Sequence, residues 1–238
     1  RVLDSARAPR GIMHVENGDF AGALDAVTAP WPSLPAIAAG MIGSAQGWVE
    51  APYLPCPAGP GDLAGALARV PGRQIWIVPG VLCAGEHPDV MRGEETQIAG
   101  ALALRPELAA GARLVLPGTH SKWARIAAGG IESFTTYMTG ELFAVLKNHS
   151  ILGRLTDPAP GHGGDAAFLR GVDAARGADG IAPLLFSARA LALTGGIAAA
   201  DALDYLSGLL IGDELRSALT EPGEAPLLIG EPALCARY

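Results

Sequence analysis

The chain has 238 residues, half of them hydrophobic, and carries a formal net charge of −7 at pH 7. This length allows one large domain or two smaller ones, and the apolar fraction argues against intrinsic disorder. The negative charge argues against binding to nucleic acid or to anionic membranes. The mean hydropathy is +0.29, yet no apolar run reaches the ~18 residues that a membrane helix needs.

The three cysteines, Cys56, Cys83 and Cys235, are far apart and have no Cys-x-x-Cys spacing. We therefore expect neither a disulfide framework nor a zinc site. We see no signal peptide, and a reducing cytoplasmic compartment fits this cysteine usage best. The chain starts at Arg1 rather than at methionine and stops within a helical pattern, so we expect it to be trimmed at both ends.

Helical and extended patterns alternate in the first half of the chain. Asp19 stands where the first helix would be capped, and Pro79-Gly80 interrupts a β-rich segment. In chain order we expect a helix over 18–31, a buried apolar run and a glycine-rich segment over 36–53, a helix over 61–70, a β-rich segment over 73–83, and a turn followed by a helix over 89–106.

The second half starts with strands and continues with helices. In chain order we expect a hairpin around the stretch LPGTHSKW, a strand over 130–138, a helix over 140–149 capped by Thr139, a loop over 157–165, helices over 166–177, 182–193 and 200–219, a strand over 225–230 and a final helix. A β-rich middle, a helical block and a strand-to-helix return predict an α/β fold with a mixed sheet.

The tip of the expected hairpin is unusually polar, because residues 119–122 read Thr-His-Ser-Lys directly after an apolar strand. A tight glycine turn gathers backbone N–H groups that bind phosphate, and the hydroxyls of Thr119 and Ser121 and the charge of Lys122 would add to it. The alternative is a solvated tip with Trp123 packed below it. Ligands of α/β sheets gather at strand ends, which favours phosphate binding here.

Two adjacent acidic residues, Glu94 and Glu95, begin the helix expected within 89–106. A kinase that phosphorylates an alcohol needs a carboxylate to accept the hydroxyl proton. Acidic residues in the first turn also stabilise a helix through its dipole. The two residues alone leave both interpretations open.

Five stretches resemble the 2-dehydro-3-deoxygalactonokinase family: GMIGSAQGWVEAPYLPCP, VMRGEETQI, LPGTHSKW, TTYMTGELFAVLKNHSILGRL and LSGLLIGDEL. The motifs are long, are unlike those of other sugar kinases, and extend over nearly the whole chain. The resemblance implies ATP- and Mg²⁺-dependent phosphorylation of 2-dehydro-3-deoxy-D-galactonate at its 6-hydroxyl, a step in galactonate catabolism. The partners would be the sugar acid and ATP. From their pattern, we expect the helices of 181–218 to form core and homodimer surface rather than a membrane element.

The family is similar in fold to the actin, hexokinase and Hsp70 superfamily, which has two ribonuclease H-like lobes with the nucleotide in the cleft between them. We therefore expect an N-terminal lobe over 1–105 and a C-terminal lobe over 106–238. That superfamily begins with a strand and an Asp-x-Gly-Thr-like phosphate loop, and nothing before Arg1 matches it. We expect this first phosphate-loop hairpin to be missing from the chain as given.

The resemblance also implies roles for individual residues. LPGTHSKW would be the second-lobe hairpin that cradles the phosphates, and LLIGEPALC the loop near the nucleoside. In the exopolyphosphatase branch of the superfamily a Glu-Glu pair precedes the second phosphate loop, and this analogy makes Glu95 the base, with Glu94 in reserve. The nucleotide-side residues would be Gly118, Thr119, His120, Ser121 and Gly230, with Lys122 acting in catalysis.

A second set of residues is expected to contact the sugar acid: Ser44, Gln46, Trp48, Thr139, Glu141 and His149. The segment 40–50 would hydrogen-bond and stack on the substrate, or else form a glycine-rich turn anchored by a core tryptophan. Thr139 and Glu141 would line the cleft, although capping alone explains Thr139 and Glu141 is also the second-best base by chemistry. His149 would face the sugar carboxylate, or simply favour the helix C-terminus.

No metal-ligand set is expected, since His162 has no second ligand at suitable spacing. Two other functions remain open. One is a phosphohydrolase of the same fold, which the Glu-Glu analogy suggests. The other is a non-catalytic sugar-acid sensor, which the missing first loop suggests.

Overall fold

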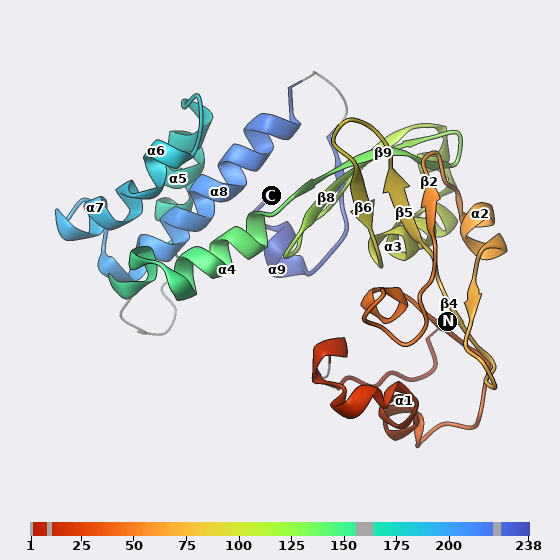
Figure 1. Cartoon of the computed structure of the whole chain (residues 1–238). Helices are drawn as coiled ribbons and strands as arrows, with labels where there is room; N and C mark the ends of the chain where they lie inside the picture. Colours follow the sequence, from red (N-terminus) through yellow and green to blue (C-terminus); the bar gives the residue numbers. More distant parts are fainter. Residues whose placement is uncertain (1, 9–10, 156–163, 221–224) are drawn as a thin grey trace. The chain divides into compact units, whose positions relative to one another are not determined.

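The computed structural model describes residues 2–8, 11–155, 164–220 and 225–238 (Figure 1). The chain divides into two compact units. Unit 1 comprises Arg1–Ala112 and Ala124–Phe134, and unit 2 comprises Arg113–Trp123 and Thr135–Tyr238. The expected lobes over 1–105 and 106–238 do not coincide with these units, because three strands within 112–137 contribute residues to both. The lobe boundary at residue 105 stays a prediction.

Unit 1 contains short strands in two mixed sheets. In one sheet the order is β1-β4-β3, with β1 parallel and β3 antiparallel to β4; in the other it is β2-β5-β6, with β2 parallel and β6 antiparallel to β5. The elements are α1 Phe20–Thr28, β1 Ala36–Ala38, β2 Tyr53–Pro55, α2 Pro60–Gly65, β3 Ala68–Arg69, β4 Ile75–Ile77, β5 Gly80–Cys83, β6 Asp89–Met91 and α3 Glu94–Leu104. The expected α/β fold with mixed sheets is thus confirmed.

Two sequence expectations for unit 1 are correct in detail. Asp19 caps α1, since its carboxylate accepts a hydrogen bond from the Gly22 N–H at 2.8 Å. The β-rich segment 73–83 forms β4 and β5, which are separated at Pro79. Proline has no N–H to donate to a ladder, so the strand is interrupted there.

Two other expectations for unit 1 need correction. The helix expected over 61–70 ends at Gly65, because Ala68 and Arg69 pair antiparallel with β4 as strand β3. The apolar run that starts the segment 36–53 is not buried throughout: Ile37 is 69% and Met41 is 52% exposed. Strand pairing set the end of the helix, and the surrounding structure set the exposure of the apolar run. Neither can be inferred from local composition.

Three longer strands connect the two units along the chain. They are β7 Ala112–Leu116, β8 Ser121–Ala127 and β9 Gly130–Tyr137, and with β10 Leu227–Leu228 they form a sheet of order β10-β7-β8-β9. β10 pairs parallel with β7, with Leu227 opposite Leu114 and Leu228 opposite Val115. The hairpin expected around LPGTHSKW and the strand expected over 130–138 are both present.

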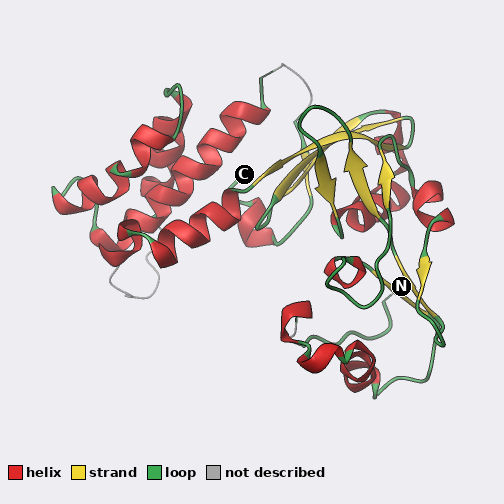
Figure 2. Ribbon diagram, viewed as in Figure 1, coloured by secondary structure: helices red, strands yellow, loops and turns green. Residues whose placement is uncertain are grey.

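The helices of unit 2 follow β9 along the chain and are drawn as a red block in Figure 2. They are α4 Thr139–His149, α5 Asp165–Arg176, α6 Ala182–Leu185, α7 Ser187–Leu193, α8 Ala202–Ala218 and, after β10, α9 Pro232–Cys235. Among the residues that the structure describes, no helix combines the length and the apolarity needed to cross a bilayer.

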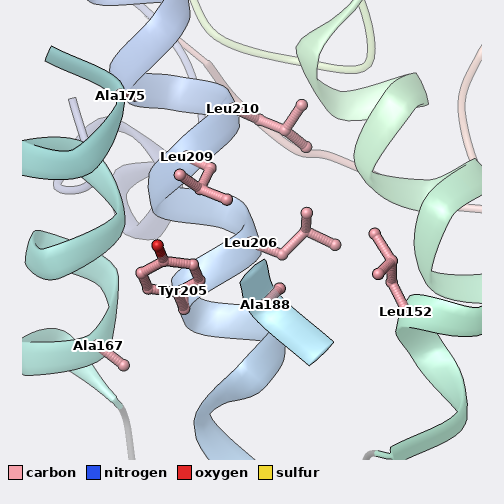
Figure 3. Close-up of a cluster of buried hydrophobic side chains, with 8 residues drawn as sticks. All are labelled: Leu152, Ala167, Ala175, Ala188, Tyr205, Leu206, Leu209 and Leu210. Carbon is pink, nitrogen blue, oxygen red and sulfur yellow. The ribbon is translucent and has the colours of Figure 1, made fainter. Parts of the chain in front are cut away.

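The helical core of unit 2 is built around α8. Tyr205, Leu206, Leu209 and Leu210 of α8 gather with side chains of α5, α7 and the turn after α4 (Figure 3). α5 and α8 approach so closely that a Cβ added to Gly208 would lie 2.0 Å from the carbonyl oxygen of Phe168. The lack of a side chain at Gly208 therefore allows α8 to pack this closely against α5. Helix α8 also carries the buried Glu214, which is described below.

Candidate active site

The polar turn between β7 and β8 lies at the end of a buried strand, as the sequence predicts. Leu114, Val115 and Leu116 of β7 are at most 3% exposed. The chain then turns through residues 117–120, where the side chains of Thr119 and His120 are exposed to solvent. The turn therefore presents a small polar surface at the end of a rigid strand.

The start of α4 packs directly on this turn. The Thr119 carbonyl accepts a hydrogen bond from the Glu141 N–H at 2.9 Å, and the Glu141 carboxylate contacts Nε2 of the His120 ring. A Cβ added to Gly140 would lie 2.4 Å from the Gly118 carbonyl oxygen. The structure thus brings Gly118, Thr119 and His120 together with Thr139, Gly140 and Glu141 within unit 2.

The expected capping role of Thr139 is wrong. The helix begins at Thr139, the cap position belongs to Met138, and the cap makes no side-chain hydrogen bond. Thr139 is 9% exposed at the junction with the turn. The Thr119 carbonyl, rather than a cap side chain, accepts the hydrogen bond of the Glu141 N–H in the first turn of the helix.

Ser121 lies beneath the turn rather than on its surface. Its side chain is 0% exposed, its Oγ accepts from the Gly118 N–H at 3.4 Å, and it lies 2.9 Å from the Tyr238 hydroxyl. In this structure the Ser121 hydroxyl is bonded inside the protein, and its expected phosphate contact stays a prediction.

A buried carboxylate continues this chain of contacts. Glu214 of α8 is 2% exposed; its Oε2 accepts from the Tyr238 hydroxyl and its Oε1 from the Trp123 indole N–H, each at 2.7 Å. Burial first, and the nearby charge of Glu214 next, raise the pKa of Tyr238. The phenol consequently keeps its proton and acts as a donor to the carboxylate.

Sequence reasoning missed both Glu214 and Tyr238. One signal was available for Glu214, which follows Leu210 and Ile211 at helical spacing and therefore falls on the apolar face of α8. A carboxylate on such a face is rarely buried without a partner. No local signal pointed to Tyr238, which is 117 residues from Ser121 in the chain.

Lys122 is also buried, at 5% exposed. Its ammonium donates to the Thr136 hydroxyl at 2.7 Å, on the neighbouring strand β9. The side chain is therefore directed toward β9 in this structure, not toward the exposed tip of the turn.

Gly230 lies beside Pro117 at the base of the turn, and its nucleotide role stays a prediction. A Cβ added there would lie 3.5 Å from the Pro117 carbonyl oxygen and 3.5 Å from the Cys235 sulfur. The preceding residue, Ile229, donates its N–H to the Val115 carbonyl at 2.9 Å. Parallel pairing of β10 with β7 thus places Gly230 next to Pro117.

The acidic pair of α3 belongs to unit 1. Glu95 is 0% exposed and its carboxylate accepts from the Gly93 N–H at 2.6 Å and the Thr96 hydroxyl at 2.9 Å. Burial raises the pKa of Glu95, and these hydrogen bonds counteract part of that effect. Glu94 is half-buried and accepts from the Arg92 N–H at 3.1 Å.

The glycine-rich segment 40–50 uses most of its polar and aromatic groups internally. The Ser44 hydroxyl donates to the Met41 carbonyl at 2.8 Å and closes a turn. The Trp48 ring stacks on Phe20 with 6.4 Å between ring centroids, beneath the Arg73 guanidinium. Gln46 is exposed. These contacts favour the turn anchored by a core tryptophan over stacking of Trp48 on a sugar acid.

His149, expected to contact the sugar acid, lies away from the turn. His149 is exposed at the last residue of α4, whereas Glu141 lies in its first turn, about 12 Å earlier along the helix axis. His162 falls outside the described residues. Within the described part of the chain, no group of three or more His, Cys, Asp or Glu side chains is arranged to hold a metal ion.

Comparison with known proteins agrees with this sequence and fold. A family model described as 2-keto-3-deoxy-galactonokinase matches residues 1–238. A probable 2-dehydro-3-deoxygalactonokinase of Rhizobium meliloti is 43% identical over 249 residues, covering 100% of this chain and 80% of the relative. The 2-dehydro-3-deoxygalactonokinase of Escherichia coli is 38% identical over 242 residues, covering 99% of this chain and 80% of the relative.

The fold has a solved counterpart as well. The crystal structure of a candidate 2-dehydro-3-deoxygalactonokinase from Sinorhizobium meliloti has a TM-score of 0.90 and 40% identity, over 100% of this chain and 82% of that chain. By sequence and by structure, the chain belongs to the 2-dehydro-3-deoxygalactonokinase family.

Proposed function

We propose that the protein is a kinase that uses ATP to phosphorylate 2-dehydro-3-deoxy-D-galactonate at its 6-hydroxyl, within an actin-like two-lobed fold. The names of its relatives support the reaction. The structural observation that carries the proposal is the meeting of the 117–120 turn with the start of α4. Clustered backbone amides at a turn and a helix N-terminus favour bound phosphate oxygens.

On the nucleotide side, the exposed groups of this turn would bind the transferred phosphoryl group. Thr119 offers a hydroxyl, and His120 offers its second ring nitrogen, because Nε2 is already used by Glu141. A histidine ring has two nitrogens, so one can contact the carboxylate while the other contacts a phosphate oxygen. Ser121 and Lys122, both buried, would act by shaping the turn.

On the substrate side, a carboxylate of α3 would accept the proton of the sugar hydroxyl. Glu95 remains the first candidate, because burial raises its pKa and a base with a raised pKa takes up a hydroxyl proton more readily. Glu94 is the more exposed of the two and remains in reserve. Mg²⁺ would arrive with ATP and neutralise its phosphate charge; we assign it no protein ligand.

A coupled kinase assay tests this function directly. Full-length protein receives ATP and Mg²⁺ with the keto acid derived from galactonate, with the one derived from gluconate, or with no sugar acid. We expect ADP to form only with a sugar acid, and faster with the galactonate-derived compound.

The same assay separates the rival functions. Phosphate release from ATP at an equal rate without sugar would identify a phosphohydrolase. A sensor would bind the sugar acid in calorimetry but neither bind nor consume ATP. Either result would contradict the proposed kinase.

A further inference from the structure

The buried carboxylate of Glu214 controls the direction of a hydrogen-bond chain that ends in the turn. A carboxylate only accepts hydrogen bonds, so Trp123 and Tyr238 must both donate to it. Since the single phenolic proton of Tyr238 points to Glu214, Ser121 must donate to the Tyr238 oxygen at 2.9 Å. The Ser121 oxygen then accepts from the Gly118 N–H.

The far end of this chain is anchored in the helical core of unit 2. Glu214 lies on α8, and Arg237, the neighbour of Tyr238, pairs with Asp204 of α8 at 2.8 Å. The Arg237 guanidinium also lies 4.5 Å from the centroid of the Phe168 ring of α5. Both Glu214 and Tyr238 are therefore fixed by packed helices, so they can hold the turn at a defined position.

At the other end, the turn is held from two sides. Gly118 is bonded inward to Ser121, while the carbonyl of Thr119 accepts from Glu141 of α4. Thr119 and His120 are left facing solvent between these two supports. A ligand that binds there meets groups already in place, which lowers the entropy lost on binding.

We propose that Glu214, acting through Tyr238 and Ser121, is a positioning residue that presets the 117–120 turn for nucleotide phosphates. This inference rests on the proposed function. Under this proposal, neither Glu214 nor Tyr238 contacts the nucleotide itself. We refer to Gly118, Ser121, Tyr238, Glu214 and Trp123 as the turn relay. A relay that only satisfied buried polar groups would affect folding stability but leave nucleotide affinity unchanged.

The test compares relay variants with a matched tyrosine variant in the coupled assay, using full-length protein. Tyr238→Phe and Ser121→Ala interrupt the relay. Tyr137→Phe is the control. The Tyr137 hydroxyl also contacts α8, where it donates to the Ser217 hydroxyl at 3.2 Å, and the Tyr137 ring also packs on Trp123, with 6.5 Å between ring centroids. Thermal unfolding of every variant is recorded alongside KM for each substrate and kcat.

We expect Tyr238→Phe and Ser121→Ala to raise KM for ATP roughly tenfold, equivalent to about 1.4 kcal/mol, and to leave KM for the sugar acid unchanged. Because both act through one chain, the double variant should be no worse than the worse single variant. Additive effects, or a KM for ATP equal to that of Tyr137→Phe, would overturn the proposal.

Glu214→Gln provides a second variant with nearly the same shape. Its amide N–H₂ would face the Tyr238 oxygen, so Tyr238 must turn its proton toward Ser121 and the relay reverses. We expect the same rise in KM for ATP as in Tyr238→Phe; a wild-type KM would overturn the role of the carboxylate. If Glu214→Gln does not fold, the Tyr238 and Ser121 variants decide.

Failure of the relay and failure of the proposed function give different results. A wild-type protein that forms no ADP with any sugar acid refutes the function. Binding of ATP to the same variants is then measured by calorimetry, which tests the relay without turnover. Equal dissociation constants for wild type, Tyr238→Phe and Ser121→Ala would refute the relay.

Discussion

At the scale of single residues, Glu95 combines full burial with an ionisable group. Its folded pKa is raised above the ordinary value of 4.5, first by desolvation. The stability associated with this shift is fully present below pH 4.5 and is lost as pH rises through the folded pKa. Burying Glu95 therefore makes the folded state less stable at pH values above its folded pKa than at acidic pH.

Glu95→Gln separates a catalytic from a structural role. We expect turnover to fall by about 10²–10⁴-fold, the usual contribution of a general base, with KM for ATP little changed. Relative to wild type, the variant should also gain thermal stability as pH rises from 4.5 through the folded pKa of Glu95, because glutamine does not ionise in either the unfolded or the folded state.

The control is Glu94→Gln, in the same turn of α3 and half-buried. If Glu94→Gln loses turnover while Glu95→Gln keeps it, the base is Glu94 and Glu95 only supports the Gly93 turn through its hydrogen bond. Full turnover in both variants would remove α3 from the mechanism.

At the scale of secondary-structure elements, the contact between the 117–120 turn and α4 depends on the absence of a side chain at residue 140. Gly140 lies in the first turn of α4, where alanine would normally favour the helix by about 1 kcal/mol. An added Cβ would, however, lie 2.4 Å from the Gly118 carbonyl oxygen. Steric overlap at this distance outweighs helix propensity, so the turn or the helix must move.

Gly140→Ala should therefore lower stability by about 1–3 kcal/mol and raise KM for ATP, because the turn is displaced from α4. Urea unfolding and the coupled assay measure the two effects. Gly180→Ala is a matched control in unit 2, since no heavy atom of the described residues lies within 4 Å of a Cβ added there. Equal stability of the two variants would contradict the contact.

The secondary structure around the turn was largely predictable, since local patterns suffice for the hairpin of β7 and β8 and for most of the helices. The start of α4 at Thr139 and the end of α2 at Gly65 were not, because contacts with other elements set them. The relay was beyond prediction for the same reason: a serine, a glutamate and a tyrosine far apart in the chain become partners only after folding.

At the scale of the whole molecule, the C-terminal segment completes the surroundings of the turn. β10 pairs with β7, Gly230 lies against Pro117, and Tyr238 reaches Ser121. The helical core around α8 is assembled from other residues, Leu206 and Leu209 among them. The turn therefore depends on the C-terminal segment as well as on α8, whereas the cluster around α8 is made of residues that precede this segment.

Ile229→Pro tests this dependence, since proline removes the N–H that Ile229 donates to Val115. We expect ATP affinity in calorimetry to fall while the far-UV circular dichroism of the helices is retained. Ala225→Pro, at an exposed residue shortly before β10, is the control. Unchanged ATP affinity in Ile229→Pro would show that the turn does not need the C-terminal segment.

The separation of Ser121 and Tyr238 in sequence has a consequence for biosynthesis. The ribosome adds about 5–20 residues per second, so the 117 residues between them take about 6–23 s to translate. During this interval the residues of β7 and β8 have been synthesised, but the phenol oxygen that accepts the hydrogen bond of Ser121 has not. The contacts of Ser121 and Glu214 with Tyr238 can therefore form only after the chain has been translated to residue 238.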